Sequence, residues 1–218
     1  MVVTLLVAGS QAQAISFDLA FRDSTYQVVT GDTYDDLVLE HESGFLRAAL
    51  TIAGIDGVTS GASAATNADY STSITTTFTA AVSGVYTFQV GTDWGRGGAS
   101  KAVHVGTGTV LDEFVTTDDI WWANDWSNPD VLTMALTLAE NETYSLGWVG
   151  FEGCCAGNVT FRFSVDGSPF ATLDDTNFDG FENPGAVPEP GTAILLGVGL
   201  VGLGLSRRRN GLLGSATT

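Results

Sequence analysis

Alternating apolar and polar residues recur along the middle of the chain. Six segments carry this period of two: residues 15–21, 74–78, 86–90, 132–138, 144–148 and 159–165. Successive side chains of a strand point to opposite faces, so each segment can place one face on a core and the other in water. No long stretch repeats with a helical period. We therefore predict an all-β fold, an antiparallel β-sandwich of the jelly-roll or lectin-like type, followed by a short hydrophobic C-terminal helix.

That helix is expected over residues 192–205, an apolar run that contains four glycines. Pro188-Glu189-Pro190 precedes the run, and Arg207-Arg208-Arg209 follows it. The prolines keep the approach extended, and the basic cluster favours retention of this end on the cytoplasmic side. About fourteen helical residues span only about 21 Å, whereas a comfortable bilayer span needs about 20 residues. We therefore predict transient membrane insertion, with an ordinary tail anchor as the alternative.

The N-terminal segment has the pattern of a secretory leader. Residues 2–8 are apolar, and Ala12-Gln13-Ala14 follows them as a small-x-small cleavage pattern. We predict a signal peptide over 1–14, truncated at its start because no basic residue precedes the apolar stretch. The exported chain then divides into a sandwich domain (15–173), an acidic linker (174–187), a sorting segment (188–209) and a tail (210–218).

Acidic residues dominate the charge of the chain. The 25 aspartates and glutamates outnumber the 8 lysines and arginines, so the formal net charge is −17 at pH 7. Such a surface is a poor partner for nucleic acid and for anionic membrane surfaces, and we expect neither. Divalent cations and neutral polysaccharide remain as ligands. Alternatively, the charge only keeps an exported protein soluble.

Three of the five tryptophans lie close together beside acids and amides. These residues, Trp121, Trp122 and Trp126, suit carbohydrate, because sugar C–H faces stack on aromatic rings while hydroxyl groups bond to polar side chains. The alternative is that the rings fill the edge of the sandwich, since tryptophan is usually well buried. We predict a carbohydrate-binding surface here.

The only two cysteines, Cys154 and Cys155, are adjacent. In an exported protein they should be oxidised, yet a trans peptide holds neighbouring Cα atoms about 3.8 Å apart, which is short for a disulfide. We predict a strained vicinal disulfide that forms a rigid apolar platform on a loop. Metal binding and cross-linking to a partner are the alternatives.

Candidate metal ligands stand at alternate positions near the end of the acidic body. Asp175, Asn177 and Asp179, followed by Gly180, fit the first half of a calcium loop. We expect no resident cofactor, with calcium as a possible ligand, and the alternative is an acidic linker. The sequence has no zinc-binding helix pattern or nucleophile elbow, so we assign no catalytic residue.

The C-terminal pattern resembles the PEP-CTERM sorting signal of exopolysaccharide-producing bacteria. In that family an exosortase, a membrane-embedded sorting protease, recognises the tail and cuts near Pro-Glu-Pro. The resemblance therefore implies an exosortase-type partner, an inner-membrane intermediate, and delivery to the cell envelope or extracellular matrix. Cys154-Cys155-Ala156-Gly157 is similar to the motif that marks the Cys-Cys-x-Gly subfamily of these proteins.

The body of the chain carries a second resemblance. Segments 78–88 and 136–146 both have the pattern of a strand, a tight turn and a strand with an inward aromatic, which is typical of a hairpin. Their order over residues 69–165 resembles the lectin-like sandwich of anthrax protective antigen, flocculins and some glycosidases. In its sugar-binding members two adjacent aspartates after the first hairpin hold calcium. Here the matching residues are Asp93 and Trp94, so only Asp93 carries over as a sugar-site residue.

These observations predict an exported, non-enzymatic protein of the surface or biofilm matrix. It would associate with exopolysaccharide as an adhesive or structural component. The alternative is a polysaccharide-active enzyme of the glycoside hydrolase type, which needs only two suitably placed carboxylates.

Overall fold

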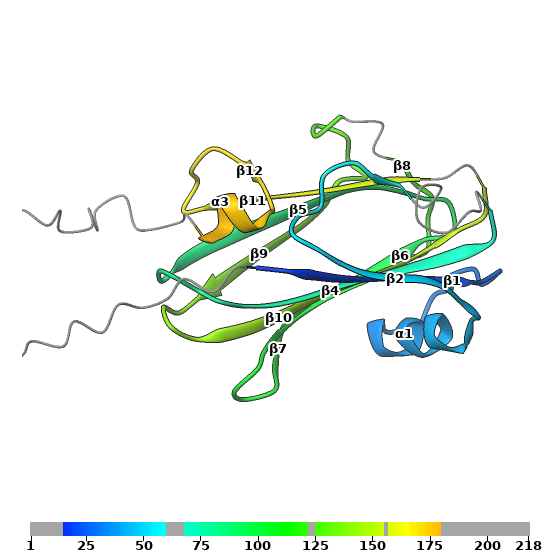
Figure 1. Ribbon diagram of the computed structural model, residues 1–218, viewed down its shortest axis with the longest axis horizontal. Coiled ribbons are helices and arrows are strands. Elements are labelled where there is room, and N and C mark those ends of the chain that lie inside the picture. Colours follow the sequence, from blue (N-terminus) through cyan, green and yellow to red (C-terminus); the bar gives the residue numbers. More distant parts are fainter. Residues whose placement is uncertain (1–14, 60–67, 122–124, 155–156, 180–218) are drawn as a thin grey trace, which may run out of the picture. The chain divides into compact units, whose positions relative to one another are not determined.

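The computed structural model describes residues 15–59, 68–121, 125–154 and 157–179. They form an antiparallel β-sandwich with one helix, α1, on the outside of one sheet (Figure 1). The elements are β1 (Phe17–Asp23), α1 (Tyr34–Ser43), β2 (Leu46–Ile52), β3 (Val58–Thr59), β4 (Tyr70–Thr79), β5 (Gly84–Trp94), β6 (Gly98–His104), β7 (Thr109–Thr116), β8 (Ile120–Trp121), β9 (Leu132–Leu138), β10 (Thr143–Glu152), β11 (Asn158–Val165), β12 (Ala171–Thr172) and α3 (Asp175–Asp179).

Two sheets make the two layers of the sandwich. The first sheet has the strand order β2-β1-β4-β10-β6-β7. The second has the order β12-β11-β5-β8, with β3 also paired to β11 and β9 also paired to β5. All of these pairings are antiparallel. The predicted all-β sandwich is therefore confirmed.

The alternating rows of the sequence supply the core between the two sheets. Five of the six predicted segments lie within a strand, and the sixth, 15–21, begins two residues before β1; their apolar positions point inward. In β9, for example, Met134, Leu136 and Leu138 are buried, while Ala135 and Thr137 between them are exposed. The three inward residues belong to one buried cluster with Phe161 and Phe163 of β11 and Trp148 of β10. Burial of these side chains is the main favourable term that holds the layers together.

The two segments that predicted hairpins instead connect the two sheets. Strand β4 belongs to the first sheet and β5 to the second, and the same is true of β10 and β9. Phe78 and Phe88 therefore face each other across the core, with ring centroids 6.1 Å apart. The two connections bond to each other through the Asn141 N–H, which donates to the Ala80 carbonyl at 2.8 Å. The hairpin prediction was wrong because a turn signal does not tell which sheet the second strand joins.

Helix α1 was not predicted, because its ten residues show only weak amphipathic periodicity. A capping box begins the helix: the Asp36 N–H donates to Thr33 Oγ1, and the Thr33 N–H donates to the Asp36 carboxylate. Leu37, one of its buried residues, packs against the outer face of the first sheet. Gly147 makes this approach possible, since a Cβ at that position would collide with the hydroxyl of Tyr34.

The packed body extends past the predicted boundary after residue 173. Phe178 of α3 is 6 % exposed, and its ring lies 4.8 Å from that of Phe78 and 4.9 Å from that of Phe163. The N-terminal compact unit accordingly includes α3. A linker that began at Asp174 would expose this apolar ring to water, which is unfavourable. In the structure the ring instead closes one end of the core.

Several predicted segments lie outside the described residues. They are the leader (1–14), the residues after Asp179, and with them the sorting segment, its apolar helix and the tail. Within the described part, no helix has the length and hydropathy of a membrane span.

Candidate functional site

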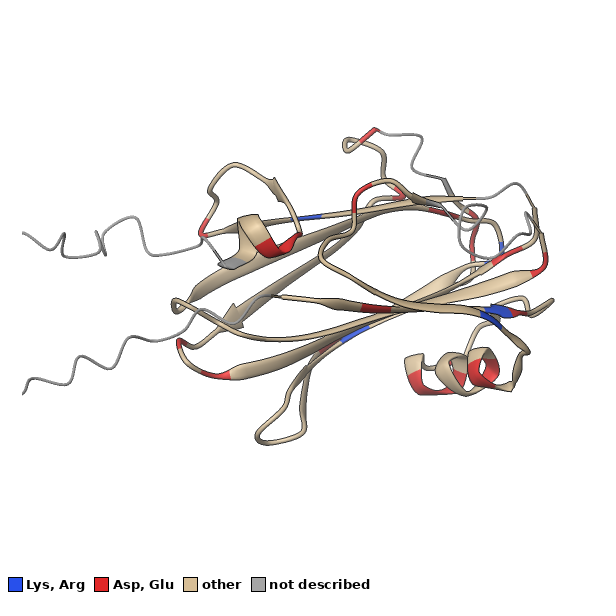
Figure 2. Cartoon of the chain, viewed as in Figure 1, with Lys and Arg blue, Asp and Glu red and all other residues tan. Residues whose placement is uncertain are grey.

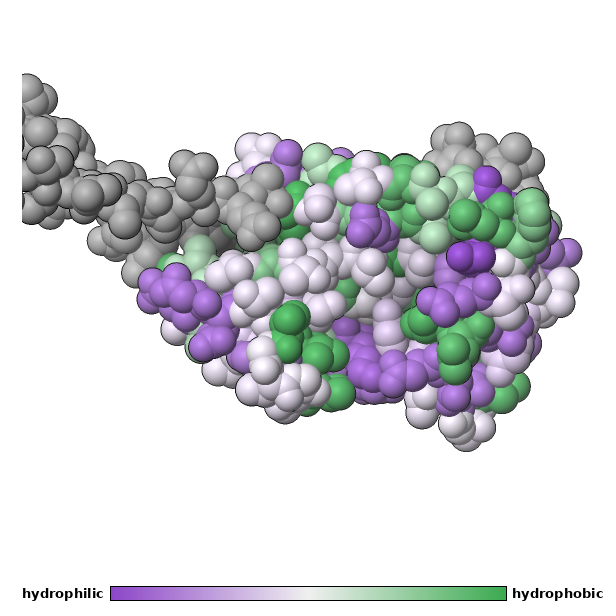
Figure 3. Space-filling view, turned by 60° about the horizontal axis from the view of Figure 1, so that its bottom comes forward, coloured by the Kyte–Doolittle hydropathy of each residue, from purple (hydrophilic) through white to green (hydrophobic). Residues whose placement is uncertain are grey.

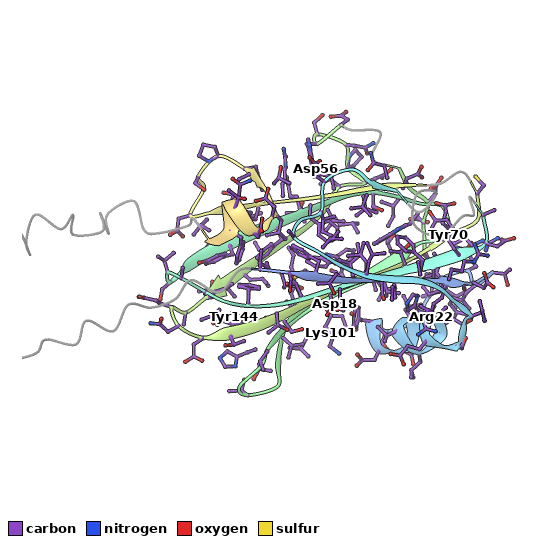
Figure 4. All side chains as sticks on the ribbon, in the orientation of Figure 1. Asp18, Arg22, Asp56, Tyr70, Lys101 and Tyr144 are labelled. Atoms are coloured by element: carbon purple, nitrogen blue, oxygen red, sulfur yellow. The ribbon has the colours of Figure 1, made fainter. Side chains whose placement is uncertain are left out.

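A groove lies on the outer face of the second sheet. Its volume is about 360 Å³, and it is lined by Asp56, Gly57, Trp126, Asn158, Thr160, Arg162, Phe170, Ala171 and Thr172. The residues Asn158, Thr160 and Arg162 alternate along β11 with the inward Val159 and Phe161. The period of two thus places three polar side chains on one surface. Figure 4 shows Asp56 on the β12 side of the sandwich and Lys101 on the opposite, α1 side.

Arg162 is the one basic side chain in the lining of the groove. Its Cζ lies 4.0 Å from the centroid of the Trp126 ring and 4.4 Å from that of the Phe170 ring. The Nε–H donates to Oε1 of Gln89, its register partner on β5, at 2.8 Å. Partial burial lowers the pKa of the guanidinium from its usual value. The side chain is therefore held from three sides while its charge stays in the groove.

The rest of the groove presents hydrogen-bonding groups. The Gly57 N–H donates to Oγ1 of Thr160 at 2.9 Å, which ties the β2–β3 connection to β11. Oδ1 of Asn158 is buried and has no hydrogen-bond partner among the described residues. A buried acceptor without a partner is costly, so a donor from a ligand or from water is favoured at this point.

Asp93 lies on β5, beside the strand that carries the groove. It pairs in register with Trp121 of β8, while Trp94 next to it is fully buried in the core. Burial, Glu152 and Asp119 raise the pKa of Asp93. Of the predicted sugar-binding residues, Trp126 lines the groove and Asp93 lies outside its lining. Trp122 and the side chain of Trp121 lie outside the described part.

Glu152 at the end of β10 has a structural role. It is 2 % exposed, and its two oxygens accept the N–H groups of Gly95 at 3.0 Å and Cys154 at 2.8 Å. Both oxygens are thus engaged with the two turns that meet at this end of the sandwich. A carboxylate held and buried in this way is closed to a polymer substrate.

The turn after Glu152 contains the cysteine pair. Cys154 is disulfide-bonded, and Gly153 before it packs against the guanidinium of Arg96. Cys155 lies outside the described residues, so the vicinal pairing with Cys154 stays a prediction.

The predicted calcium ligands lie in a short helix rather than in an open loop. Asp175, Asn177 and Asp179 belong to α3, where the Asn177 side-chain amide donates to Asp174 at 2.9 Å. No three His, Cys, Asp or Glu side chains of the described residues are grouped to hold a metal ion. Calcium binding here stays an untested prediction.

His41, the buried histidine, is also part of the packing. Its Nδ1 shares a hydrogen bond of 2.7 Å with Oγ of Ser71, between α1 and β4. Burial and the nearby Arg22 lower the pKa of His41 to about 4, so the ring is neutral at pH 7.

The first sheet carries a second hollow of about 410 Å³, and its lining contains neither an aromatic ring nor a basic side chain: Asp18, Leu19, Ala20, Ala49, Leu50, Thr51, Ser73 and Thr75. Figure 2 marks acidic residues on α1 and around the strand ends, with few basic residues. Figure 3, which brings the α1 side forward, shows small apolar patches separated by hydrophilic residues. Leu39 of α1 and Val110 of β7 are examples of exposed apolar side chains. Scattered exposure of this kind is normal for a folded protein.

Comparison with known proteins identifies the C-terminal segment. Residues 186–209 match the PEP-CTERM protein-sorting motif. The chain carries a PEP-CTERM sorting motif. Such a motif implies an exported protein that passes the membrane and is processed by an exosortase. No curated protein matches the chain in sequence.

Solved structures share the fold of the sandwich that precedes this motif. An anti-sigma factor domain-containing protein has a TM-score of 0.50 at 11% identity, covering 76% of this chain and 47% of its own. The PA14 sugar-binding domain from an RTX adhesin has a TM-score of 0.45 at 12% identity, covering 75% and 97%. The A domain of epithelial adhesin 9 from Candida glabrata, solved with Galβ1-4GlcNAc, has a TM-score of 0.46 at 10% identity, covering 78% and 95%. At these identities the likeness concerns the fold alone.

Sequence reasoning missed most of the groove. Arg162, Asn158 and Phe170 were not selected, although the alternation along 159–165 already placed residues 160 and 162 on the outer face. No pattern in the sequence indicates that Trp126 and Phe170, 44 residues apart, contact the same arginine.

Proposed function

We propose that this exported protein binds polysaccharide in the groove on its second sheet. It would act as an adhesive or structural component of the envelope or extracellular matrix, in association with the exopolysaccharide of its producer. One observation carries the proposal: Trp126 and Phe170 flank a groove with hydrogen-bonding side chains. Sugar C–H faces stack on aromatic rings, and a few convergent polar groups fix the orientation of the ligand. The sorting motif supports the route to such a polymer.

The alternative, a glycoside hydrolase, has weaker support. A hydrolase needs an acid and a second carboxylate that both reach the scissile bond. Asp93 has a raised pKa, as a general acid would, but its neighbour Glu152 is buried and bonded to two backbone amides. We therefore place binding without cleavage first.

Retention on polymer tests the proposal. The purified protein is run through immobilised exopolysaccharide from the producing strain, and reducing ends are measured in the same mixture. We expect retention without release of reducing ends. Trp126→Ala should weaken retention about tenfold, because it removes the larger ring of the groove.

Phe45→Ala is the matched control, since this ring is 76 % exposed and does not line the groove. It should leave retention unchanged. Equal retention of Trp126→Ala and the unchanged protein would refute the groove as the binding surface, and release of reducing ends would favour the enzyme.

A further inference from the structure

Within the described residues, Arg162 is a cation without a carboxylate partner, although the chain is strongly acidic. Arg47, Arg96 and Lys101 each form an ion pair with an aspartate. No carboxylate of the described residues forms an ion pair with Arg162, and its only hydrogen bond in this part of the chain uses Nε. The terminal N–H groups of the guanidinium are therefore available for an acceptor that enters the groove.

The arginine is also held in place before any ligand binds. The rings of Trp126 and Phe170 lie over Cζ, and Gln89 fixes the Nε edge. A side chain that has already lost its rotamer freedom gives up less entropy on binding. Partial burial has also removed part of its hydration, which strengthens its attraction for an anion.

We propose that the groove selects acidic sugars and that Arg162 binds the carboxylate of a uronic acid residue. This inference rests on the proposed polysaccharide-binding function. The planar guanidinium donates two parallel hydrogen bonds to a carboxylate, a geometry that a neutral sugar cannot use. The ring hydroxyls of the sugar then bond to the other polar groups of the groove, including the unpartnered Oδ1 of Asn158.

Asp56, in the same groove, limits the charge of the ligand. A groove lined by one arginine and one aspartate suits a singly charged sugar carboxylate better than a phosphate, which carries nearly two charges at neutral pH. Asp56 also accepts hydrogen bonds from sugar hydroxyls. Its replacement by asparagine should therefore strengthen the binding of an acidic sugar, whereas loss of Arg162 should weaken it.

Titration of the full-length protein with uronate oligosaccharides tests the inference. The probes are oligogalacturonate, oligomannuronate and oligoglucuronate, each compared with its methyl ester, which keeps the sugar and removes the charge. At least one acid form should bind about 10- to 100-fold more tightly than its ester, the range expected for hydrogen bonds to a charged group. Added salt should reduce this preference.

Four variants sharpen the test. Arg162→Gln should abolish the preference for acid over ester, Arg162→Lys should keep part of it, and Asp56→Asn should raise it severalfold. Lys101→Gln removes a cation on the other sheet and should leave it unchanged. Thermal unfolding of each variant confirms that it is folded, and Arg162→Lys with the salt dependence decides the question if Arg162→Gln does not fold.

The outcomes separate the inference from the function on which it rests. If acids and esters bind equally and Trp126→Ala weakens both, the groove binds carbohydrate without selecting acidic sugars, and this inference is overturned. If no oligosaccharide binds and retention on exopolysaccharide is also absent, both the inference and the proposed function are overturned.

Discussion

Replacing Phe178 with alanine tests whether α3 is part of the sandwich core. The ring is 6 % exposed and packs edge-on against Phe78, with centroids 4.8 Å apart, and against Phe163 at 4.9 Å. The change removes this contact surface and leaves a cavity at one end of the core. Phe178→Ala should therefore destabilise the whole sandwich, although it lies just before the sorting segment.

The expected size follows from the packing. Truncation of a buried phenylalanine costs about 3–5 kcal/mol of unfolding free energy. We expect roughly 3 kcal/mol, the lower end of this range, because α3 is the last described element and can move to close part of the cavity. For a domain of this size each kcal/mol lowers Tm by about 2–4 °C, so Tm should fall by about 6–12 °C.

Urea unfolding followed by tryptophan fluorescence, together with thermal unfolding followed by circular dichroism, measures the change. Phe45→Ala is the control, because that ring is 76 % exposed and its loss should change stability by no more than about 0.5 kcal/mol. If the two variants unfold with the same free energy, α3 does not contribute to the core, and the extension of the packed body past residue 173 is refuted.

Three further predictions concern other parts of the body. Gly147→Ala should detach α1 from the first sheet, because the new Cβ collides with the hydroxyl of Tyr34; loss of amide protection confined to α1 in hydrogen exchange would show this. The pKa of His41 is lowered to about 4 in the folded state, so its contribution to stability is complete above its unfolded pKa of about 6.5 and is lost as pH falls toward 4. From pH 7.5 to 5 the loss should be about 2 kcal/mol, and urea unfolding of His41→Gln should lack this component. Intact-mass analysis with alkylation should find no free thiol at Cys154 or Cys155 before reduction; two alkylated thiols would refute the predicted disulfide.

Much of the fold could be read from the alternating rows. Their apolar positions, such as Leu136 and Phe163, became the core because a strand that buries one face must place every second residue there. The same periodicity set which face of β11 carries Arg162 before any contact was known. The sequence also predicted Trp126 as a binding residue, and the structure places it in the groove.

Other features depended on contacts between distant segments. The turn after Phe78 has the local pattern of a hairpin, but the strand beyond it joins the other sheet, where its partners are β9 and β11. Helix α1 has weak periodicity of its own and depends on the space left by Gly147 on β10. Phe178 was predicted to lie in an acidic linker, and only its contacts with Phe78 and Phe163 place it in the core.

The chain's local pattern was sufficient for β1, β4, β5, β9, β10 and β11, their buried faces, the acidic surface and the sorting motif, because each depends on residues close together in the sequence. The groove required the folded chain. Arg162 contacts Trp126 of the β8–β9 connection and Phe170 of the β11–β12 connection, and it bonds to Gln89 of β5. These three partners are separated from one another by tens of residues, so only the pairing of β5 with β11 and the path of the two connections could bring them to one cation.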